Sequence, residues 1–532
     1  MYTPLVVKNS IKTTSVTSLM AENGINIKDL PQLLDATYAQ NIQNYILTGT
    51  GQLEKRKGYG KLFDEIAGGF AITMYEKFTD DIHVFAYNTT VAIYTKSTGV
   101  VATIKSDFAG TSFEGVRYGD FFFVTNKTDG LWCIDSTLAI TDLSAIAPKA
   151  NQIAIFGARM ILGDLDTDDT AIVYSAPDDG TDPPFSLAAA WTTGTLMTNA
   201  GQVYYRNGGQ VTCISSLGET IIGFGKEGKW GFQITAENIA GVYYKNDDPV
   251  FYRHDFGGER GAISTPVGLI YANNKGFWQL TSVGTTNIPF SDQESNLPVL
   301  LGDTYFDNID VTNGSLIYDA KRGYIYLTCA QNSSTNNLVI AMCMTRRVKT
   351  ISKFTGMNIS RWLDDDGTIY GASDAKTILY EMFTGSEDDG SPIATDFYQE
   401  LSLGSLSSRK TLLGTYTQGF LSPSSVINVK YDIYDTEGKF SIDKLKYEWT
   451  TQYTLGTSGG WGSSEWGRSP WGGDVDYANL VPSFDGNNST IRNCQRVCIH
   501  ITCSDKYHHV INWLSLRAKE KVNIRRRRMV QL

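Results

Sequence analysis

The middle of the chain repeats one pattern, in which two segments with near-alternating apolar positions flank a short polar turn. Alternation along both arms with turn residues between them predicts a β-hairpin. Seven segments show the pattern: IHVFAYNTTVAIYTK (82–96), FFFVTNKTDGLWCID (121–135), RMILGDLDTDDTAIVYSA (159–176), TIIGFGKEGKWGFQIT (220–235), GLIYANNKGFWQLTS (268–282), SLIYDAKRGYIYLTC (315–329) and TIYGASDAKTILYEM (368–382).

The turns of these hairpins recur every 39 to 59 residues, and the longest step contains a loop insertion, SAPDDGTDPPFSLAAAW. A period of this size that carries several strands indicates a propeller blade. We therefore expect an all-β protein with a seven-bladed β-propeller over residues 61–395, in which Phe277 and Trp278 face a blade core and its neighbour. An irregular pair of β-sandwiches is the alternative.

After Asp396 the predicted strands become longer and alternate strictly, as in SSVINVKYDIYDTEGKFSI and RVCIHITCSDKYHHVINWLSLRAKEK. This change predicts a separate β-sandwich-like platform module over residues 396–516. Residues 1–60 are expected to pack on it. Within them LPQLLDATYAQNIQNYIL (30–47) is the one segment that we expect to form a short helix.

A glycine- and serine-rich loop, GGWGSSEWGRSPWGG (459–473), interrupts the platform and carries Trp461, Trp466 and Trp471. Their five-residue spacing fits neither a helix nor a strand. Tryptophan is enriched where protein surfaces meet, so the loop is predicted to be a clasp between subunits. Burial against its own platform and contact with a membrane are the alternatives.

The charge is distributed unevenly along the 532 residues. The chain carries a net charge of −10, and 51 glycines against 14 prolines fit many short strands and tight turns. The last sixteen residues (517–532) form a predicted basic tail with the cations Arg517, Lys519, Lys521, Arg525, Arg526, Arg527 and Arg528. These cations are expected to dock on a neighbouring ring or on DNA, and a solvated tail is the alternative.

Signals for chemistry are few. The sequence has no nucleophile elbow, zinc-protease, phosphate-loop or dinucleotide fingerprint, so no enzyme activity, catalytic residue or cofactor is predicted. The scattered cysteines are expected to be reduced thiols inside strands, and RVCIHITC (496–503) is expected to be a strand, not a zinc site. The acidic runs GDLDTDDT (163–170) and DDDG (364–367) are expected to be solvated turns, with calcium binding as the alternative. No membrane-spanning segment or signal peptide is predicted.

Three stretches resemble the tail hub, or nozzle, proteins of short-tailed bacteriophages, which are related to packaged-DNA stabilisation proteins. The first is GINIKDLPQLLDATYAQNIQNYILTGTGQLEKRKGYGKL, in which Gly51 followed by residues 52–59 matches a G-x-L-E-K-R-x-G-Y turn. The second is ARMILGDLDTDDTAIVYSAPDDGTDPPFS, which is similar to one blade of that family. The third is the glycine–tryptophan loop.

The resemblance implies a structural virion protein of the phage tail, made in the cytoplasm of the host bacterium. It implies a homohexameric ring below a portal or adaptor ring, in contact with tail fibres or other tail proteins. Genomic DNA would pass along the axis with transient, non-specific contact during ejection. The alternatives are a tail-tip adhesin or glycan-processing propeller, and a host-derived scaffold propeller.

The tryptophan loop provides a first test. We expect that changing Trp461, Trp466 and Trp471 together to serine leaves a folded subunit that no longer forms rings, because the clasp would lose its three large apolar side chains. Size-exclusion chromatography with light scattering would measure assembly, and thermal unfolding would measure folding. An unfolded variant would instead support burial within the subunit, and intact rings of unchanged stability would contradict both interpretations.

Overall fold

The structure is a computed structural model of the chain. It describes residues 13–16, 23–27, 37–48, 52–204, 208–247, 250–251, 261–273, 276–281, 294–297, 308–345, 350–402, 409–421, 425–435, 444–454, 477–480, 491–494 and 496–521. Within these ranges the protein is all-β, as expected, and the one helical element is a short 3₁₀ helix, η2 (Ala188–Trp191).

The helix expected over residues 30–47 is wrong where the structure describes it. Residues 41–47 instead form β2 (Asn41–Gln43) and β3 (Tyr45–Leu47), with Asn44 at a positive φ between them. Ile42, Tyr45 and Leu47 are fully or almost fully buried. Pairing with long platform strands and burial of these side chains override the local helix pattern.

Apart from a separate two-stranded hairpin, the described strands between residues 72 and 297 form five successive antiparallel sheets of four strands each. The first contains β6 (Ile72–Lys77), β7 (Ile82–Tyr87), β8 (Thr90–Thr95) and β9 (Val100–Lys105), and the second β10 (Glu114–Tyr118), β11 (Phe121–Asn126), β12 (Gly130–Ile134) and β13 (Ile140–Asp142). The third contains β14 (Ala150–Phe156), β15 (Arg159–Leu165), β16 (Ala171–Tyr174) and β17 (Gly201–Tyr204). The fourth contains β18 (Val211–Leu217), β19 (Thr220–Gly225), β20 (Lys229–Phe232) and β23 (Val250–Phe251), and the fifth β24 (Ala262–Thr265), β25 (Gly268–Asn273), β26 (Gly276–Leu280) and β27 (Glu294–Leu297).

The next two sheets continue the series but extend beyond four strands. The sixth contains β28 (Ile309–Asp310), β29 (Leu316–Asp319), β30 (Tyr324–Gln331), β31 (Leu338–Cys343) and β32 (Thr350–Thr355). The last contains β33 (Ile359–Asp365), β34 (Thr368–Ser373) and β35 (Leu379–Met382), followed by β5 (Tyr59–Lys61) from the start of the chain and by β36 (Glu387–Asp388) and β37 (Ser391–Pro392). All seven predicted hairpins are confirmed as paired strands.

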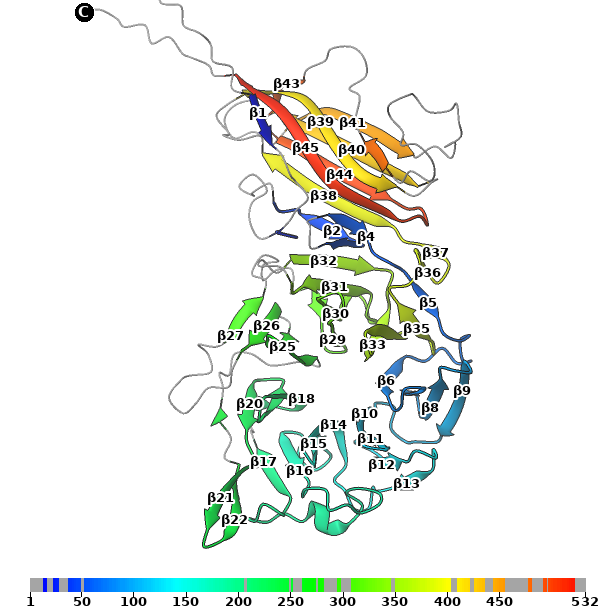
Figure 1. The fold of residues 1–532 in the computed structure, drawn as a ribbon, viewed down its shortest axis with the longest axis vertical. Coiled ribbons are helices and arrows are strands. Elements are labelled where there is room, and N and C mark those ends of the chain that lie inside the picture. The colour runs from blue at the N-terminus through cyan, green and yellow to red at the C-terminus, as the bar shows by residue number, and fades with distance from the viewer. Residues whose placement is uncertain are drawn as a thin grey trace, which may run out of the picture.

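These sheets stand around a common centre (Figure 1). The innermost strands contact one another in the order β6, β10, β14, β18, β24, β29 and β33, and β33 contacts β6 to close the ring. Apolar clusters fill each seam between neighbouring sheets. Phe277 belongs to the cluster between the fifth and sixth sheets, and Trp278 packs against the cluster between the fourth and fifth, as expected.

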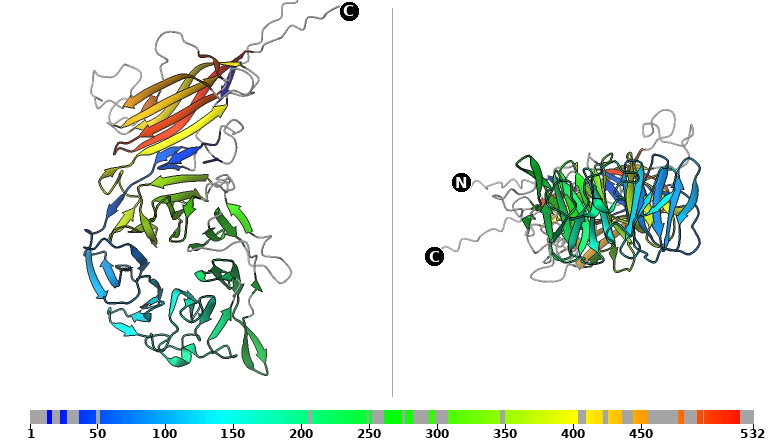
Figure 2. Two further views of the ribbon diagram at one scale, coloured as in Figure 1. Left: turned by 180° about the vertical axis from the view of Figure 1, so that it is seen from behind. Right: turned by 90° about the horizontal axis from the view of Figure 1, so that it is seen from below.

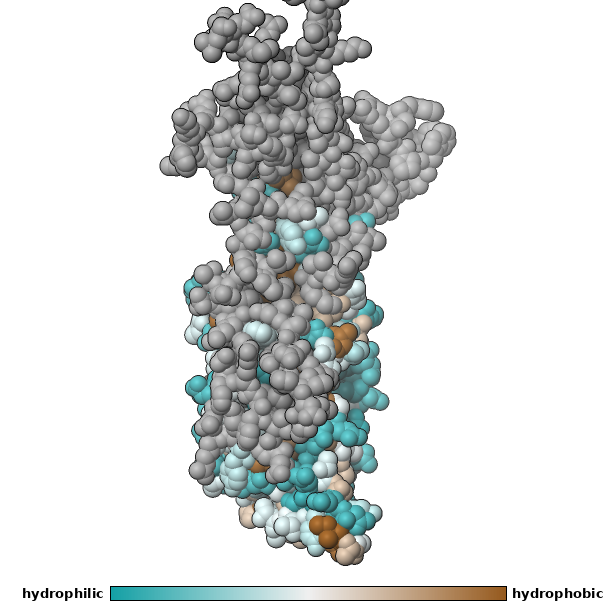
Figure 3. Space-filling model, turned by 90° about the vertical axis from the view of Figure 1, so that its left-hand side faces the viewer, coloured by the Kyte–Doolittle hydropathy of each residue, from teal (hydrophilic) through white to brown (hydrophobic). Residues whose placement is uncertain are grey.

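A hairpin leaves the fourth sheet at the end of the ring farthest from the long C-terminal strands (Figure 1). It consists of β21 (Thr235–Ile239) and β22 (Val242–Asn246). Its tip exposes Ile239, Val242 and Tyr243. Figure 3, which views this side, shows apolar side chains at the lower end.

The remaining strands form two sheets with a shared core, which we call the platform. One sheet contains β3, β4 (Leu53–Lys55), β45 (His509–Lys521), β39 (Arg409–Leu421) and β42 (Tyr477–Leu480), with β1 (Thr13–Val16) and β43 (Ile491–Cys494) at its side. The other contains β2, β38 (Thr395–Ser402), β44 (Arg496–Cys503), β40 (Val426–Asp435) and β41 (Lys444–Thr454). The strand predicted at 496–503 is confirmed, and Val497, Ile499 and Ile501 are buried in this core.

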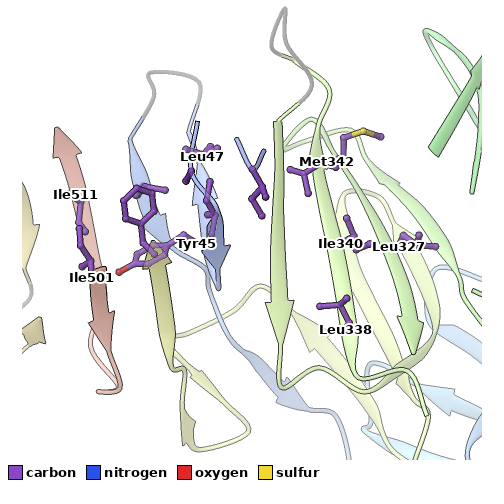
Figure 4. Packing of buried hydrophobic residues seen from close by; sticks show 14 of the residues in the cluster. Tyr45, Leu47, Leu327, Leu338, Ile340, Met342, Ile501 and Ile511 are labelled. Atoms are coloured by element: carbon purple, nitrogen blue, oxygen red, sulfur yellow. The ribbon is translucent and has the colours of Figure 1, made fainter. Parts of the chain in front are cut away.

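The platform lies beside the ring, next to β32, in both views along the ring axis (Figures 1 and 2). β2 pairs with β32 in parallel and with β38 antiparallel, so one continuous sheet runs from the ring into the platform. Figure 4 shows the core at this boundary, where Tyr45 and Leu47 lie between Ile501 and Ile511 of the platform and Ile340 and Met342 of the ring.

Two expected boundaries therefore move. β5 belongs to the ring although it begins at Tyr59, before the expected boundary at residue 61. β45 extends to Lys521, so Arg517, Lys519 and Lys521 lie on a paired platform strand and not in a separate tail.

Candidate functional site at the joint and the ring centre

One short segment pairs with both units. β4 pairs with β3 and β45 in the platform, and three residues later β5 pairs with β35 in the ring. We call residues 53–61 the strap. Lys55 and Arg56, in its middle, are each only 1% exposed. Two adjacent buried cations require partners, because an unpaired buried charge is strongly destabilising.

The Lys55 ammonium is held by the platform. Its Nζ donates to the carbonyl oxygens of Asp505 at 2.5 Å and Tyr507 at 3.1 Å, and lies 3.7 Å from the Asp505 carboxylate. Burial lowers the pKa of Lys55, although the charge of Asp505 opposes this effect. The side chain thus fixes the turn 505–507 that precedes β45.

The Arg56 guanidinium is held mainly by the ring and by the segment that follows β35. Nη1 and Nη2 donate to the two Asp388 carboxylate oxygens at 2.8 and 2.5 Å. Nη2 also donates to the Thr355 carbonyl at 2.9 Å, and Nε to Asn44 Oδ1 at 2.8 Å. A two-point guanidinium–carboxylate pair is strong and directional. Arg56 therefore joins the sixth sheet, the segment that follows the last sheet, and the N-terminal strands.

A histidine beside the strap is locked in its neutral form. His509 Nε2 lies 2.9 Å from the Tyr45 hydroxyl, which also accepts a hydrogen bond from Thr395. Burial, with the charge of Lys55 adding to it, lowers the pKa of His509 to about 3. At neutral pH this group supplies no proton switch.

A crevice opens beside the strap. Leu47, Tyr324 and Phe383 form part of its apolar wall, and Lys57 and Arg322 contribute cations. The Arg322 guanidinium lies 5.1 Å from the centre of the Phe383 ring.

A second polar cluster closes the ring where the last sheet meets the first. Asp365 on β33 is 5% exposed and receives hydrogen bonds from Lys96, from Lys77 at 2.6 Å, and from His83 at 3.3 Å. Burial opposes ionisation, but these three hydrogen bonds prevail and lower the pKa of Asp365 to about 2. The carboxylate is thus ionised at neutral pH.

Another charged group lies on the innermost strands of three sheets. Arg361 on β33 pairs with Glu114 on β10 at 3.3 Å. Glu76 lies on β6, one of the innermost strands, and is exposed. Desolvation, followed by the like charge of Glu114, raises the pKa of Glu76 to about 8. Two carboxyl groups, of which Glu76 has a raised pKa, and an arginine therefore lie on the innermost strands of three sheets.

The residues predicted as sites fall largely elsewhere. Trp461, Trp466 and Trp471 lie outside the described residues, as do Arg525, Arg526, Arg527 and Arg528. Arg517, Lys519 and Lys521 occupy alternate positions of β45, which pairs with β39 and partly with β1.

The acidic runs are not simply solvated turns, as the sequence had suggested. Asp164 is buried and accepts hydrogen bonds from Lys127, Asn151 and Gln210 on neighbouring sheets and loops. Asp365 is buried in the same way. Within the described ranges no three His, Cys, Asp or Glu residues gather as metal ligands do. Cys133, Cys329 and Cys343 are buried free thiols there.

Sequence reasoning missed Lys55, Arg56, Asp388 and Asp365 as partners. In LEKRKGYGKL three cations follow one another, and no local pattern marks Lys55 and Arg56 as buried. Their partners lie hundreds of residues away, so spacing alone did not reveal them.

No family model matches the chain, and no curated protein matches it. Solved structures that match include a chain of the mitotic checkpoint complex, with 12% identity, a TM-score of 0.42, and coverage of 68% of this chain and 100% of that one. The computationally designed Ika8 protein matches with 10% identity, a TM-score of 0.33, and coverage of 61% and 99%. The extracellular domain of the one-component system BT4673 from B. thetaiotaomicron matches with 9% identity, a TM-score of 0.40, and coverage of 70% and 46%. No helix in the described ranges is long and apolar enough to cross a membrane.

The Asp365 cluster predicts a specific acid sensitivity. Its folded pKa of about 2 lies below the ordinary value of 3.8, so its stabilisation is complete above pH 4 and is lost as the pH falls toward 2. Asp365→Asn should reduce the free energy of unfolding at pH 7 by about 2 kcal/mol and flatten this acid dependence. Thermal unfolding between pH 2 and 7 would measure it.

Asp366→Asn is the matched control, because Asp366 also pairs with Lys77 but its side chain is 86% exposed. This variant should unfold like the wild type. Equal effects of the two substitutions would contradict a special role for the buried carboxylate.

Proposed function

We propose that the ring is a seven-bladed β-propeller and that the chain is a structural subunit of the tail nozzle of a short-tailed bacteriophage. One observation carries this proposal. The turn through which the sequence resembles that family, Gln52–Tyr59, is the segment that joins the ring to the platform. In a structural subunit the function depends on how the ring and the platform are held together. A shared motif is therefore expected where the two units join.

The architecture supports the propeller interpretation. The sheets stand around one centre, their innermost strands contact each other in sequence, and β5 adds an early strand to the last sheet. The N-terminal strand β5 closes the ring through backbone hydrogen bonds and covers the edge of the last sheet, which would otherwise be exposed.

The charges of the chain are compatible with a conduit. A body with a net negative charge repels the DNA backbone and leaves it free to slide, whereas a lumen lined by cations would hold it. In this proposal six copies form a ring on the tail axis, below the portal or adaptor ring. The DNA path lies between subunits, and tail fibres or other tail proteins bind outside.

The proposal assigns two contacts to regions of the platform. The tryptophan loop with Trp461, Trp466 and Trp471 clasps the neighbouring subunit. Arg517, Lys519 and Lys521 on β45, continued by Arg525 to Arg528, dock on an adjacent ring or on DNA. The mature protein would reside in the virion tail.

Imaging of the purified protein tests this assignment. We expect sixfold rings in negative-stain electron micrographs, because a nozzle must match the axial symmetry of the tail. Trimers, or a monomer at concentrations well above those in an infected cell, would contradict the proposal.

A glycan-processing propeller is the second candidate, and the group at the ring centre favours it. Glycosidases use two carboxyl groups, one of which has a raised pKa and acts as the acid. Glu76, with its pKa of about 8, and Glu114 beside Arg361 have these properties.

Activity assays separate the two functions. Under the nozzle proposal the protein releases no reducing sugar from bacterial surface polysaccharides, because the charged groups at the ring centre have only a structural role. Glu76→Gln should then leave this result unchanged. Reducing-end assays between pH 5 and 9 would measure this. Sugar release that is lost in Glu76→Gln but kept in the exposed control Asp80→Asn would establish the enzyme instead.

A further inference from the structure

The strap pairs with the platform at one end and with the ring at the other, beside the sheet that β2 makes continuous between them. Leu53 and Glu54 pair with Ile511 and Val510 of the platform, whereas Tyr59, Gly60 and Lys61 pair with Met382, Glu381 and Tyr380 of the ring. Lys55, Arg56, Lys57 and Gly58 lie between the two ladders. Four residues span about 14 Å at full extension, so the strap has little slack.

Both ladders of the strap are short. Three register pairs hold β5 on β35, and two hold β4 on β45. A ladder of this length is marginal without tertiary anchors. Lys55 supplies the anchor on the platform side through Asp505 and Tyr507, and Arg56 supplies the anchor on the ring side through Asp388 and Thr355.

Gly58 fits closely against the chain that leaves the last sheet. Its N–H donates to the Gly385 carbonyl at 3.2 Å, and its own carbonyl accepts from Thr384 at 2.9 Å. A Cβ at this position would lie 1.7 Å from the Glu387 carbonyl oxygen. At Gly60, two residues along the same strap, a Cβ would meet no atom within 4 Å.

The ring has a separate closure near its centre. Asp365 with Lys77, Lys96 and His83 joins the last sheet to the first without any strap residue. Loss of the strap should therefore release the outer edge of the last sheet, at β35, and leave the inner seam closed.

We propose that the strap makes the outer closure of the ring conditional on the docking of the platform. Displacement of the platform tensions the strap and withdraws β5 from β35, and release of β5 loosens β4 on β45. The platform is in this way a mechanical control on one edge of the ring. The inference depends only on the contacts above and stands whether or not the protein is a tail nozzle.

Hydrogen exchange of backbone amides in the full-length protein tests the coupling from the ring side. Gly58→Ala should accelerate exchange roughly tenfold or more at Leu379–Met382, and also at Leu53–Lys55 and at Val510 and Ile511, because opening involves both ladders. Gly60→Ala is the matched control and should exchange like the wild type. Amides of β33 and β6 at the inner seam should be unchanged in both variants.

The platform side supplies the reverse test. Lys55→Met removes the anchor on Asp505 and Tyr507, and should accelerate exchange at Tyr380–Met382 in the ring, with the exposed Lys57→Met as its control. If this variant does not fold, Asp388→Asn, which keeps the shape of the Arg56 partner, should accelerate exchange at Leu53–Lys55. Acceleration confined to the side that carries the substitution would overturn the proposal.

Discussion

The buried cations of the strap are the constraint on which the arrangement of ring and platform depends. Arg56 is almost inaccessible to water, so its charge is tolerated only while Asp388, Thr355 and Asn44 surround it. These partners come from three different parts of the chain. The guanidinium is therefore satisfied in one relative position of the two units, and a shift of either unit would leave a buried charge unpaired.

The same principle recurs at the seams of the ring, where apolar packing alone would allow neighbouring sheets to slide. Asp365 and Asp164 each pair with a lysine from the neighbouring sheet or its turn, and Arg361 of the last sheet pairs with Glu114 of the second sheet. Dispersion between flat apolar faces has little directional preference, whereas hydrogen bonds to a buried carboxylate do. The clusters between sheets supply most of the stability, and the ion pairs fix the alignment.

Local patterns predicted the parts of the fold that local contacts determine. The alternating arms of β7 and β8, with Asn88 in the turn, form a hairpin because their partners are adjacent in sequence. Residues 41–47 resembled a helix by spacing, yet they pair with β38 and β4, of which β38 lies some 350 residues away. Asp365 looked like part of a solvated turn because its partners Lys77 and Lys96 belong to the first sheet, which is far away in the sequence. In both of these places the structure depends on long-range strand pairing or on burial of a charge, which local sequence patterns do not reveal.

The protonation states of the buried groups also bear on function. Asp365, with a pKa of about 2, and His509, with a pKa of about 3, keep one form across the neutral range. Groups that serve acid–base chemistry usually titrate near the working pH, and structural ion pairs do not. Glu76, with a pKa of about 8, is the exception, and it faces the ring centre with Glu114 and Arg361. Because none of the contacts described above at the joint involves the Glu76 side chain, a change at Glu76 would alter the chemistry of the ring centre without disturbing the contacts that hold the ring on its platform.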